Sequence, residues 1–197
     1  MSDFAKDNLR EISYILWFRI NKSMNLYEIR RRMAYDPNAK PTQKAAVRTW
    51  LGGTTKDYPL ALTLTLKQII VEKTVRGTYK RKLTRIDCEQ LARRFIQKLN
   101  RQVFGKRGAD KFGLGLKYLA VVEGQRSGKN LHLHFAVGGL PGHVRFNQFE
   151  ALVRKAKSAV ENIDAEHEVE LADSGWMEYI TKEVSARDTD NVLWTLT

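Results

Sequence analysis

Two histidines separated by one residue stand out among the side chains that can do chemistry. His132 and His134 flank Leu133 in an apolar stretch of a chain that contains four histidines. Side chains two apart on a strand leave the same face of a sheet, so both imidazoles can reach one ligand. Imidazole favours transition metals, whereas phosphate chemistry commonly uses Mg²⁺. The spacing predicts a site for Mn²⁺ or Mg²⁺, with Zn²⁺ also compatible; the alternative is two strand histidines satisfied by hydrogen bonds.

A carboxylate is expected to face the first histidine. Residues 115–123 and 131–138 are rich in Val, Leu, Tyr and Phe and flank the polar segment QRSGKN, which is typical of a β-hairpin. If the central Ser-Gly forms a two-residue turn, the register pairs Glu123 with His132 on one face, with Cβ atoms about 5 Å apart. Glu123 is therefore the predicted third metal ligand, unless a bulge next to it turns its side chain away.

A candidate nucleophile lies near the end of the chain, in SGWMEYITKEV. Apolar residues at i, i+4 and i+8 predict a helix, with Tyr179 on its flank and Lys182 one turn further along. A phenol beside a cation and a metal-bound phosphate can attack phosphorus, because positive charge favours phenolate and stabilises the charge that builds on the phosphoryl oxygens. The alternative is an aromatic at the edge of the core and a lysine paired with Glu178.

The elements that must position these residues follow a recognisable order. LALTLTLK alternates Leu with smaller or polar residues and predicts a strand. Amphipathic helices, the hairpin and a short strand follow, and a last helix opens near Asp173 or Ser174, either of which can cap it. The predicted ranges are 60–67, 87–104, 115–123, 131–138, 146–163 and 167–171. This order predicts an α+β, ferredoxin-like (βαββαβ) fold: an antiparallel sheet with helices on one face and the active site on the open face.

The N-terminal part of the chain is expected to be helical and to lie outside the catalytic domain. Apolar periodicity predicts helices over 5–21, 24–35 and 42–51. We divide the chain into an N-terminal helical extension, 1–55, with a DNA-binding or structural role, and a catalytic domain, 56–197. A helix-turn-helix is the less favoured interpretation of the extension, because the connection is too long for that motif.

Charge along the chain favours a nucleic-acid partner. The net charge is +12, and residues 67–117 hold 15 Lys and Arg against 4 Asp and Glu, whereas residues 161–190 hold 2 against 10. A dense basic block suits a phosphate backbone, although a solvated face gives the same pattern. The residues expected to contact DNA are Lys73, Arg76, Lys80, Arg81, Lys82, Arg93 and Arg94.

Other features bear on the compartment. Cys88 is the single cysteine, so no intrachain disulfide forms. We find no signal-peptide core and no apolar run long enough to span a bilayer. These features predict an intracellular, cytoplasmic protein in a reducing environment.

The alternating strand, then Leu131-His132-Leu133-His134-Phe135, then Tyr179-Ile180-Thr181-Lys182, in that order, resembles the HUH endonuclease superfamily. Within it, the pattern is similar to Rep-type initiators of rolling-circle replication that carry one catalytic tyrosine. The resemblance covers residues 60 to about 185. It implies that His132, His134 and Glu123 hold the metal, that Tyr179 is the nucleophile and that Lys182 assists it.

The resemblance also implies a function. The expected activity is site-specific nicking and joining of single-stranded or hairpin origin DNA, with a 5′-phosphotyrosine intermediate and a free 3′-OH that primes replication of a plasmid or virus. No GxxxxGK[ST] loop is present, so a host helicase and polymerase are the expected partners. A transposase of the same superfamily remains open. So do a non-catalytic single-strand binding module and a metal-independent RNA-processing nuclease that uses His and Lys.

Overall fold

The computed structural model describes residues 45, 46, 49, 55–125, 128, 130–173, 175–184 and 191–196. Its centre is a four-stranded antiparallel sheet in the order β4-β5-β1-β6. The protein is therefore α+β, and the strand order is compatible with a ferredoxin-like arrangement. The strands are β1 (Leu60–Leu66), β4 (Lys117–Glu123), β5 (His132–Gly138) and β6 (Ile163–Leu171).

Strand β1 lies in the middle of the sheet and shows why its sequence alternates. Its four leucines, at 60, 62, 64 and 66, are buried in the main core with Leu133 and Phe135 of β5. Thr63 and Thr65 leave the opposite face, because neighbouring side chains on a strand point to opposite sides. One face of the sheet is thus apolar and covered, and the other carries polar side chains.

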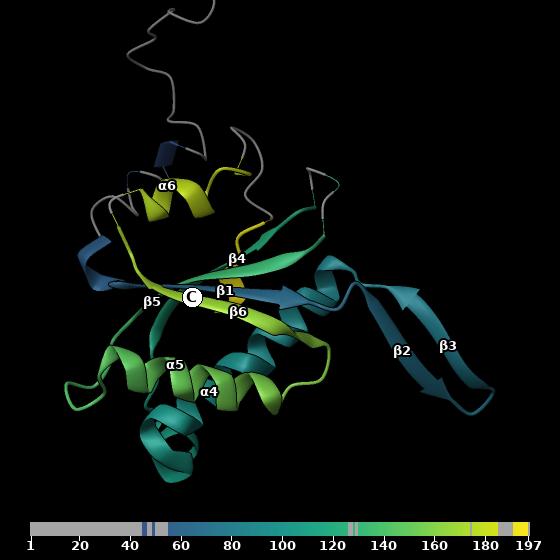
Figure 1. Cartoon of the computed structure of the whole chain (residues 1–197), viewed down its shortest axis with the longest axis horizontal. Coiled ribbons are helices and arrows are strands. Elements are labelled where there is room, and N and C mark those ends of the chain that lie inside the picture. The colour runs from purple at the N-terminus through teal and green to yellow at the C-terminus, as the bar shows by residue number, and fades with distance from the viewer. Residues whose placement is uncertain are drawn as a thin grey trace, which may run out of the picture. The chain divides into compact units, whose positions relative to one another are not determined.

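Two helices cover the apolar face, α4 (Arg85–Phe112) and α5 (Phe146–Ser158) (Figure 1). Helix α4 begins with a capping box, in which Thr84 and Asp87 satisfy each other's backbone N–H groups. Gly105 has non-helical angles (φ 74°, ψ 157°) and kinks α4, which then continues to Phe112. The helix is longer than the predicted 87–104, because the chain resumes helical geometry after this glycine.

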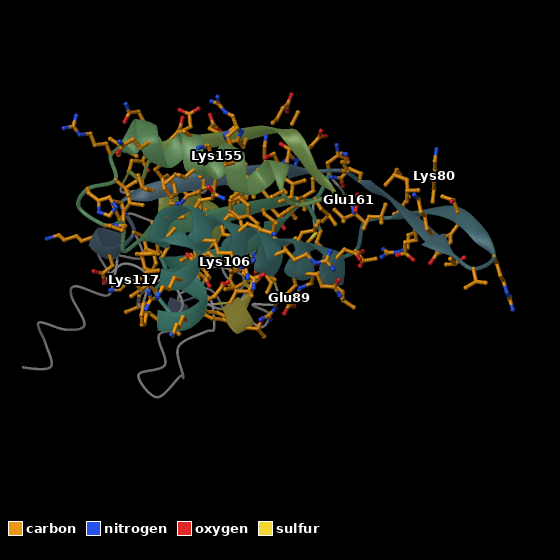
Figure 2. All side chains as sticks on the ribbon, turned by 90° about the horizontal axis from the view of Figure 1, so that it is seen from below. Lys80, Glu89, Lys106, Lys117, Lys155 and Glu161 are labelled. Carbon is orange, nitrogen blue, oxygen red and sulfur yellow. The ribbon has the colours of Figure 1, made fainter. Side chains whose placement is uncertain are left out.

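The segment between β1 and α4, for which the sequence analysis gave no element, forms a second, two-stranded sheet. Strands β2 (Ile69–Thr74) and β3 (Gly77–Lys82) pair antiparallel and extend away from the main sheet (Figures 1 and 2). We call residues 69–82 the arm. The basic composition of GTYKRK hides the β-pattern, because its side chains are almost all exposed.

The second face of the main sheet is partly covered. Helix α6 (Trp176–Ile180) lies on this face (Figure 1), opposite α4 and α5. A smaller core forms beneath it from Leu119, Val121 and Ala136 of the sheet with Met177, Ile180, Val184 and Val192. Residues 191–193 also bond to β4, through Val122 N–H to Asn191 O and Leu193 N–H to Ala120 O. In the described part of the chain, the face expected to be open is therefore covered by α6 and residues 191–193 and is open beside them.

The remaining differences from the sequence prediction are in the ends of elements. Helix α5 ends at Ser158 and not at 163, and β6 begins at Ile163 and not at 167. Of the expected N-terminal helices, residues 45, 46 and 49 are helical and the rest lie outside the described residues. The short 3₁₀ turns are η1 (Thr55–Asp57) and η2 (Trp194–Leu196). None of the described helices has the length and apolar character needed to span a bilayer.

Candidate functional site

The predicted pairing of Glu123 with His132 is confirmed by the register of β4 and β5. Thr65 of β1 faces His132 from the other side, so these three residues form the last rung at this end of the sheet. In the next rung His134 lies between Thr63 and Val121. Both histidines and Glu123 therefore leave the same face, as the alternation along each strand requires.

The His134 ring is fixed by a hydrogen bond at each nitrogen. Its Nδ1 lies 3.0 Å from Thr63 Oγ1, and its Nε2 lies 2.8 Å from Glu123 Oε2. Burial lowers the pKa of His134 to about 4, despite the opposing effect of the Glu123 charge. At neutral pH the imidazole is thus uncharged, with Nε2–H donating to Glu123 and the Thr63 hydroxyl donating to Nδ1.

Lys182, three residues after Tyr179, contacts Glu123 of the sheet. Its Nζ lies 2.7 Å from Glu123 Oε1, so the carboxylate accepts from Lys182 and His134 together. Burial alone would raise the pKa of Glu123, but the hydrogen bond from Lys182 and the nearby positive charge outweigh it and lower that pKa. Glu123 is therefore ionised at neutral pH.

Tyr179 stands at the mouth of the site. Lys182 Nζ lies 3.7 Å from the centre of its ring, the Trp176 ring stacks on it at 5.6 Å, and His134 meets it edge-on at 5.7 Å. Burial would lower the pKa of Lys182, but hydrogen bonds to Glu123 and Tyr179 raise it, so the ammonium stays charged. The tyrosine side chain remains 46% exposed and accessible to a large substrate.

Local contacts explain how α6 presents this tyrosine. Met177 and Ile180 are buried against the sheet, which directs Tyr179 and Trp176 toward the histidines. Helix α6 begins after Gly175, which offers no side-chain cap; of the two predicted capping residues, Asp173 accepts from Gly175 N–H through Oδ1 at 2.9 Å, and Ser174 lies outside the described residues. Lys182 N–H donates to Tyr179 O at 3.0 Å, so a tight turn brings the lysine back over the ring.

These residues surround a cavity of about 570 Å³ that contains members the sequence prediction missed. One wall comes from β6, where Glu168 pairs with Thr63 and Glu170 pairs with Ala61. Asp173 and Asn130 complete the lining. The polar alternation of β1 already placed Thr63 on this face, but the acidic wall required knowing that β6 is the neighbour of β1.

The side chains of His132, His134 and Glu123 are of types that bind divalent metals. In the structure, however, His134 Nε2 and Glu123 Oε2 bind each other. A neutral imidazole and an ionised carboxylate are the protonation states that a cation needs. Thr63 can accept from Nδ1–H as readily as it donates, which would free the Nε2 lone pair of His134 for a metal. As the described side chains stand, however, no three His, Cys, Asp or Glu residues form a metal-binding group. Binding would require His134 Nε2 to separate from Glu123.

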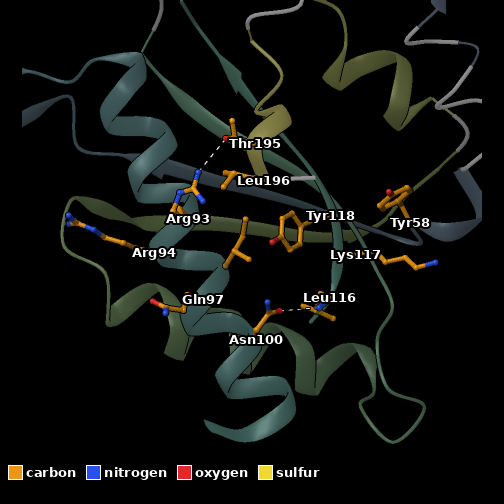
Figure 3. Close-up of a pocket in the computed structure, with 11 residues that line it drawn as sticks. Tyr58, Arg93, Arg94, Gln97, Asn100, Leu116, Lys117, Tyr118, Thr195 and Leu196 are labelled. Atoms are coloured by element: carbon orange, nitrogen blue, oxygen red, sulfur yellow. Dashed lines mark hydrogen bonds between the residues drawn. The ribbon is translucent and has the colours of Figure 1, made fainter. Parts of the chain in front are cut away.

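The predicted DNA-binding residues fall into two places. Five of them, Lys73, Arg76, Lys80, Arg81 and Lys82, lie in or at the turn of the arm. Arg81 is already paired, with hydrogen bonds of 2.6 and 2.7 Å to Asp87 and an ion pair with Glu72. Arg93 and Arg94 line a separate cavity of about 720 Å³ between α4, the start of β4 and η2 (Figure 3). They are not part of the histidine site.

Comparisons with protein-family models, with curated proteins and with solved structures found no match to this chain.

Proposed function

We propose that this protein nicks and rejoins single-stranded DNA by transesterification, with Tyr179 as the nucleophile, as HUH endonucleases do. The observation that carries the proposal is the double hydrogen bond at Glu123. It links His134 on the sheet to Lys182, which lies against the Tyr179 ring. The proposed fold is the ferredoxin-like arrangement, and the site uses the part of its second face that α6 leaves open.

The chemistry assigns a role to each side chain. The phenolate oxygen of Tyr179 attacks phosphorus, the bond from phosphorus to the 3′ oxygen breaks, and the strand is left with a free 3′-OH. The Tyr179 phenol first loses its proton to solvent, and the departing 3′ oxygen later takes a proton from solvent. Lys182 stabilises the negative charge that develops during attack. Since one phosphodiester replaces another, the reverse reaction rejoins the strand.

Glu123, His132 and His134 would hold a divalent ion, Mn²⁺ or Mg²⁺, which supplies charge neutralisation at the scissile phosphate. The acidic wall of β6 supports the proposal, because Glu168 and Glu170 favour a cation in the cavity and repel a strand that approaches without one. Thr63 holds His134 in orientation through its Nδ1.

The proposal is tested by incubating the full chain with labelled single-stranded fragments that tile the DNA encoding it, with Mn²⁺ or with EDTA. We expect a protein–DNA adduct that survives denaturation, depends on the metal and disappears in Tyr179→Phe. Tyr118→Phe is the control, because Tyr118 lines the separate cavity beside α4 and belongs neither to the histidine site nor to residues 69–82. Strand binding without cleavage or adduct in any divalent metal would refute the proposal and favour a single-strand binding module.

A second candidate function is metal-independent cleavage of RNA. It is favoured by the closed cluster in which Glu123, His134 and Lys182 already satisfy one another. This reaction would require a 2′-OH, proceed in EDTA and form no adduct, so the same assay with an RNA strand distinguishes the two. A transposase would share the adduct and differ in the DNA it joins.

A further inference from the structure

The base of the arm is anchored to the body of the protein. Arg81 binds both carboxylate oxygens of Asp87 at the start of α4 and also pairs with Glu72, to which Tyr79 donates as well. Ile70 is buried in the main core. These contacts fix the base of the arm on the body, so its surfaces have a defined orientation.

The two faces of the arm differ in character. Cross-strand pairs alternate, so the pairs Ile69–Lys82, Val71–Lys80 and Lys73–Thr78 share one face. Every residue of this face is exposed, whereas the opposite face holds buried Ile70 and the network around Arg81. We call the exposed side the lysine face; Figure 2 labels Lys80 on the arm.

The lysine face lacks acidic side chains. Among the described residues, none of Lys73, Lys80 and Lys82 takes part in an ion pair, and Arg76 adds a further cation at the turn. Ile69 and Val71 are 48% and 49% exposed and form an apolar column beside the lysines. Val75, at the turn, is also fully exposed. A surface on which cations outnumber these few apolar side chains is complementary to nucleic acid.

The base of the arm adjoins the catalytic end of the sheet. The Gln68 side chain accepts from Leu131 N–H at 2.8 Å and donates to Leu131 O at 3.0 Å, directly before His132. Thr65, three residues before Gln68, pairs with His132 in the last rung. The base of the arm therefore lies next to the candidate site.

We propose that the lysine face of the arm binds the major groove of a DNA duplex adjoining the single strand. Six paired residues span about 20 Å, the length of roughly six base pairs, and a two-stranded ribbon fits a groove about 12 Å wide. Lys73, Lys80 and Lys82 reach phosphates at the groove edges, while Ile69 and Val71 contact thymine methyl groups. The binding of a duplex by the arm does not depend on the proposed function. The further statement that the duplex lies beside the cleaved phosphate does rest on it, and the substrate is then a duplex–single-strand junction.

The test measures fluorescence anisotropy of the full chain in EDTA with a labelled stem that carries a single-stranded tail, and with the tail alone. The variant Lys73→Gln/Lys80→Gln/Lys82→Gln removes the charges of the lysine face. Its matched control is Lys106→Gln/Lys111→Gln/Lys155→Gln, three exposed lysines on α4 and α5. We expect the arm variant to lose about tenfold or more in stem affinity, with the salt slope reduced by roughly 2 to 3. The control variant should keep the stem affinity of the wild type. The affinity of the arm variant for the tail alone should fall less than its affinity for the stem.

Several results would overturn the inference. The first is an equal loss of stem affinity in the arm and control variants, and the second is an equal loss of affinity for the tail and the stem in the arm variant. The third is equally tight binding of an A-form RNA duplex. The fourth is binding through the arm to anionic phosphatidylglycerol vesicles but not to the stem. Thermal melting shows whether both variants fold. If the stem is bound through the arm but Mn²⁺ never yields an adduct, the proposed function fails and duplex binding stands. If the arm variant forms as much adduct with the stem as the wild type does, the junction is not the substrate, and the proposed nicking function still holds.

Discussion

At the scale of single residues, the Thr63 hydroxyl holds the His134 ring in orientation through its Nδ1. Thr63→Val removes this partner, 3.0 Å from Nδ1, while keeping the shape of the side chain. Because such supporting contacts are worth about 10- to 100-fold in metal affinity or activity, we expect a nicking rate lowered by about that factor and a stability loss of about 1 kcal/mol.

Thr65→Val is the matched control for this change. Thr65 lies two residues along β1 on the same face, and no side-chain hydrogen bond of its own is found among the described residues. Its nicking rate should stay close to wild type. Equal rates for the two variants, measured over a range of Mn²⁺ concentrations, would show that Thr63 does not position His134.

Residue positions in the site were predictable from the sequence where strand alternation fixed them. The shared face of His132 and His134 follows from their spacing, and the pairing with Glu123 follows from the position of the turn. The contact from Lys182 to Glu123 was not predictable, since it depends on how α6 packs on the sheet. Glu168 was missed for the same reason, because strand neighbours across β1 are set by the whole fold.

At the scale of elements, the start of α4 depends on one carboxylate. Hydrogen bonds from Arg81, with lesser contributions from Thr84, hold the pKa of Asp87 far below its usual range although burial opposes this. A lowered folded-state pKa means that the unfolded chain binds the proton first. The stability from Asp87 is therefore complete above about pH 4, the unfolded value, and is lost as the pH falls further.

Asp87→Asn tests this contribution. It should lower the free energy of unfolding at pH 7 by about 1 to 3 kcal/mol, and the difference from wild type should shrink as the pH approaches 2. Urea unfolding at several pH values measures both effects. A difference that stays constant with pH would contradict the role of the ionised carboxylate.

The end of β5 requires glycine. A Cβ at Gly138 would lie 1.7 Å from the backbone oxygen of Asp57. Gly138→Ala should therefore destabilise the protein by about 1 to 3 kcal/mol or more. Gly142→Ala is the control, because nothing lies within 4 Å of its added Cβ. Thermal melting of the two variants checks the contrast, and equal melting temperatures would show that the chain relaxes around residue 138.

Element prediction succeeded where apolar residues alternate and failed where exposed residues form regular structure. β1 was predicted within one residue, since its leucines alternate without interruption. The arm and the first half of β6 escaped prediction, because charged side chains on exposed strands carry little apolar signal. Helix α4 continues beyond its predicted end because a single glycine kinks the chain without ending the helix.

At the scale of the whole molecule, two apolar cores lie on opposite faces of one sheet. The larger unites α4 and α5 with the sheet, and the smaller holds α6. Because the smaller core has few members, α6 should open locally before the sheet unfolds. Hydrogen exchange should therefore be faster at residues 177–181 than in β1 and β5.

Ile180→Ala tests the link between this core and the site. Ile180 is 2% exposed, so its truncation should cost about 2 to 5 kcal/mol in the stability of α6. We expect exchange in α6 to accelerate by more than tenfold and adduct formation to fall with it. Exposed Ile86→Ala, where Ile86 is 68% exposed, is the control and should leave both unchanged. Unaltered exchange in the Ile180 variant would show that α6 is held by other contacts.

The position of the covalent link between protein and DNA tests the role of Tyr179 more directly than any rate measurement. After reaction with Mn²⁺, nuclease treatment and trypsin digestion, mass spectrometry should find a nucleotide joined through its 5′-phosphate to the peptide of residues 158–182. Fragmentation should place it on Tyr179. A nucleotide on any other tyrosine, or cut strands with no modified peptide, would show that Tyr179 is not the nucleophile.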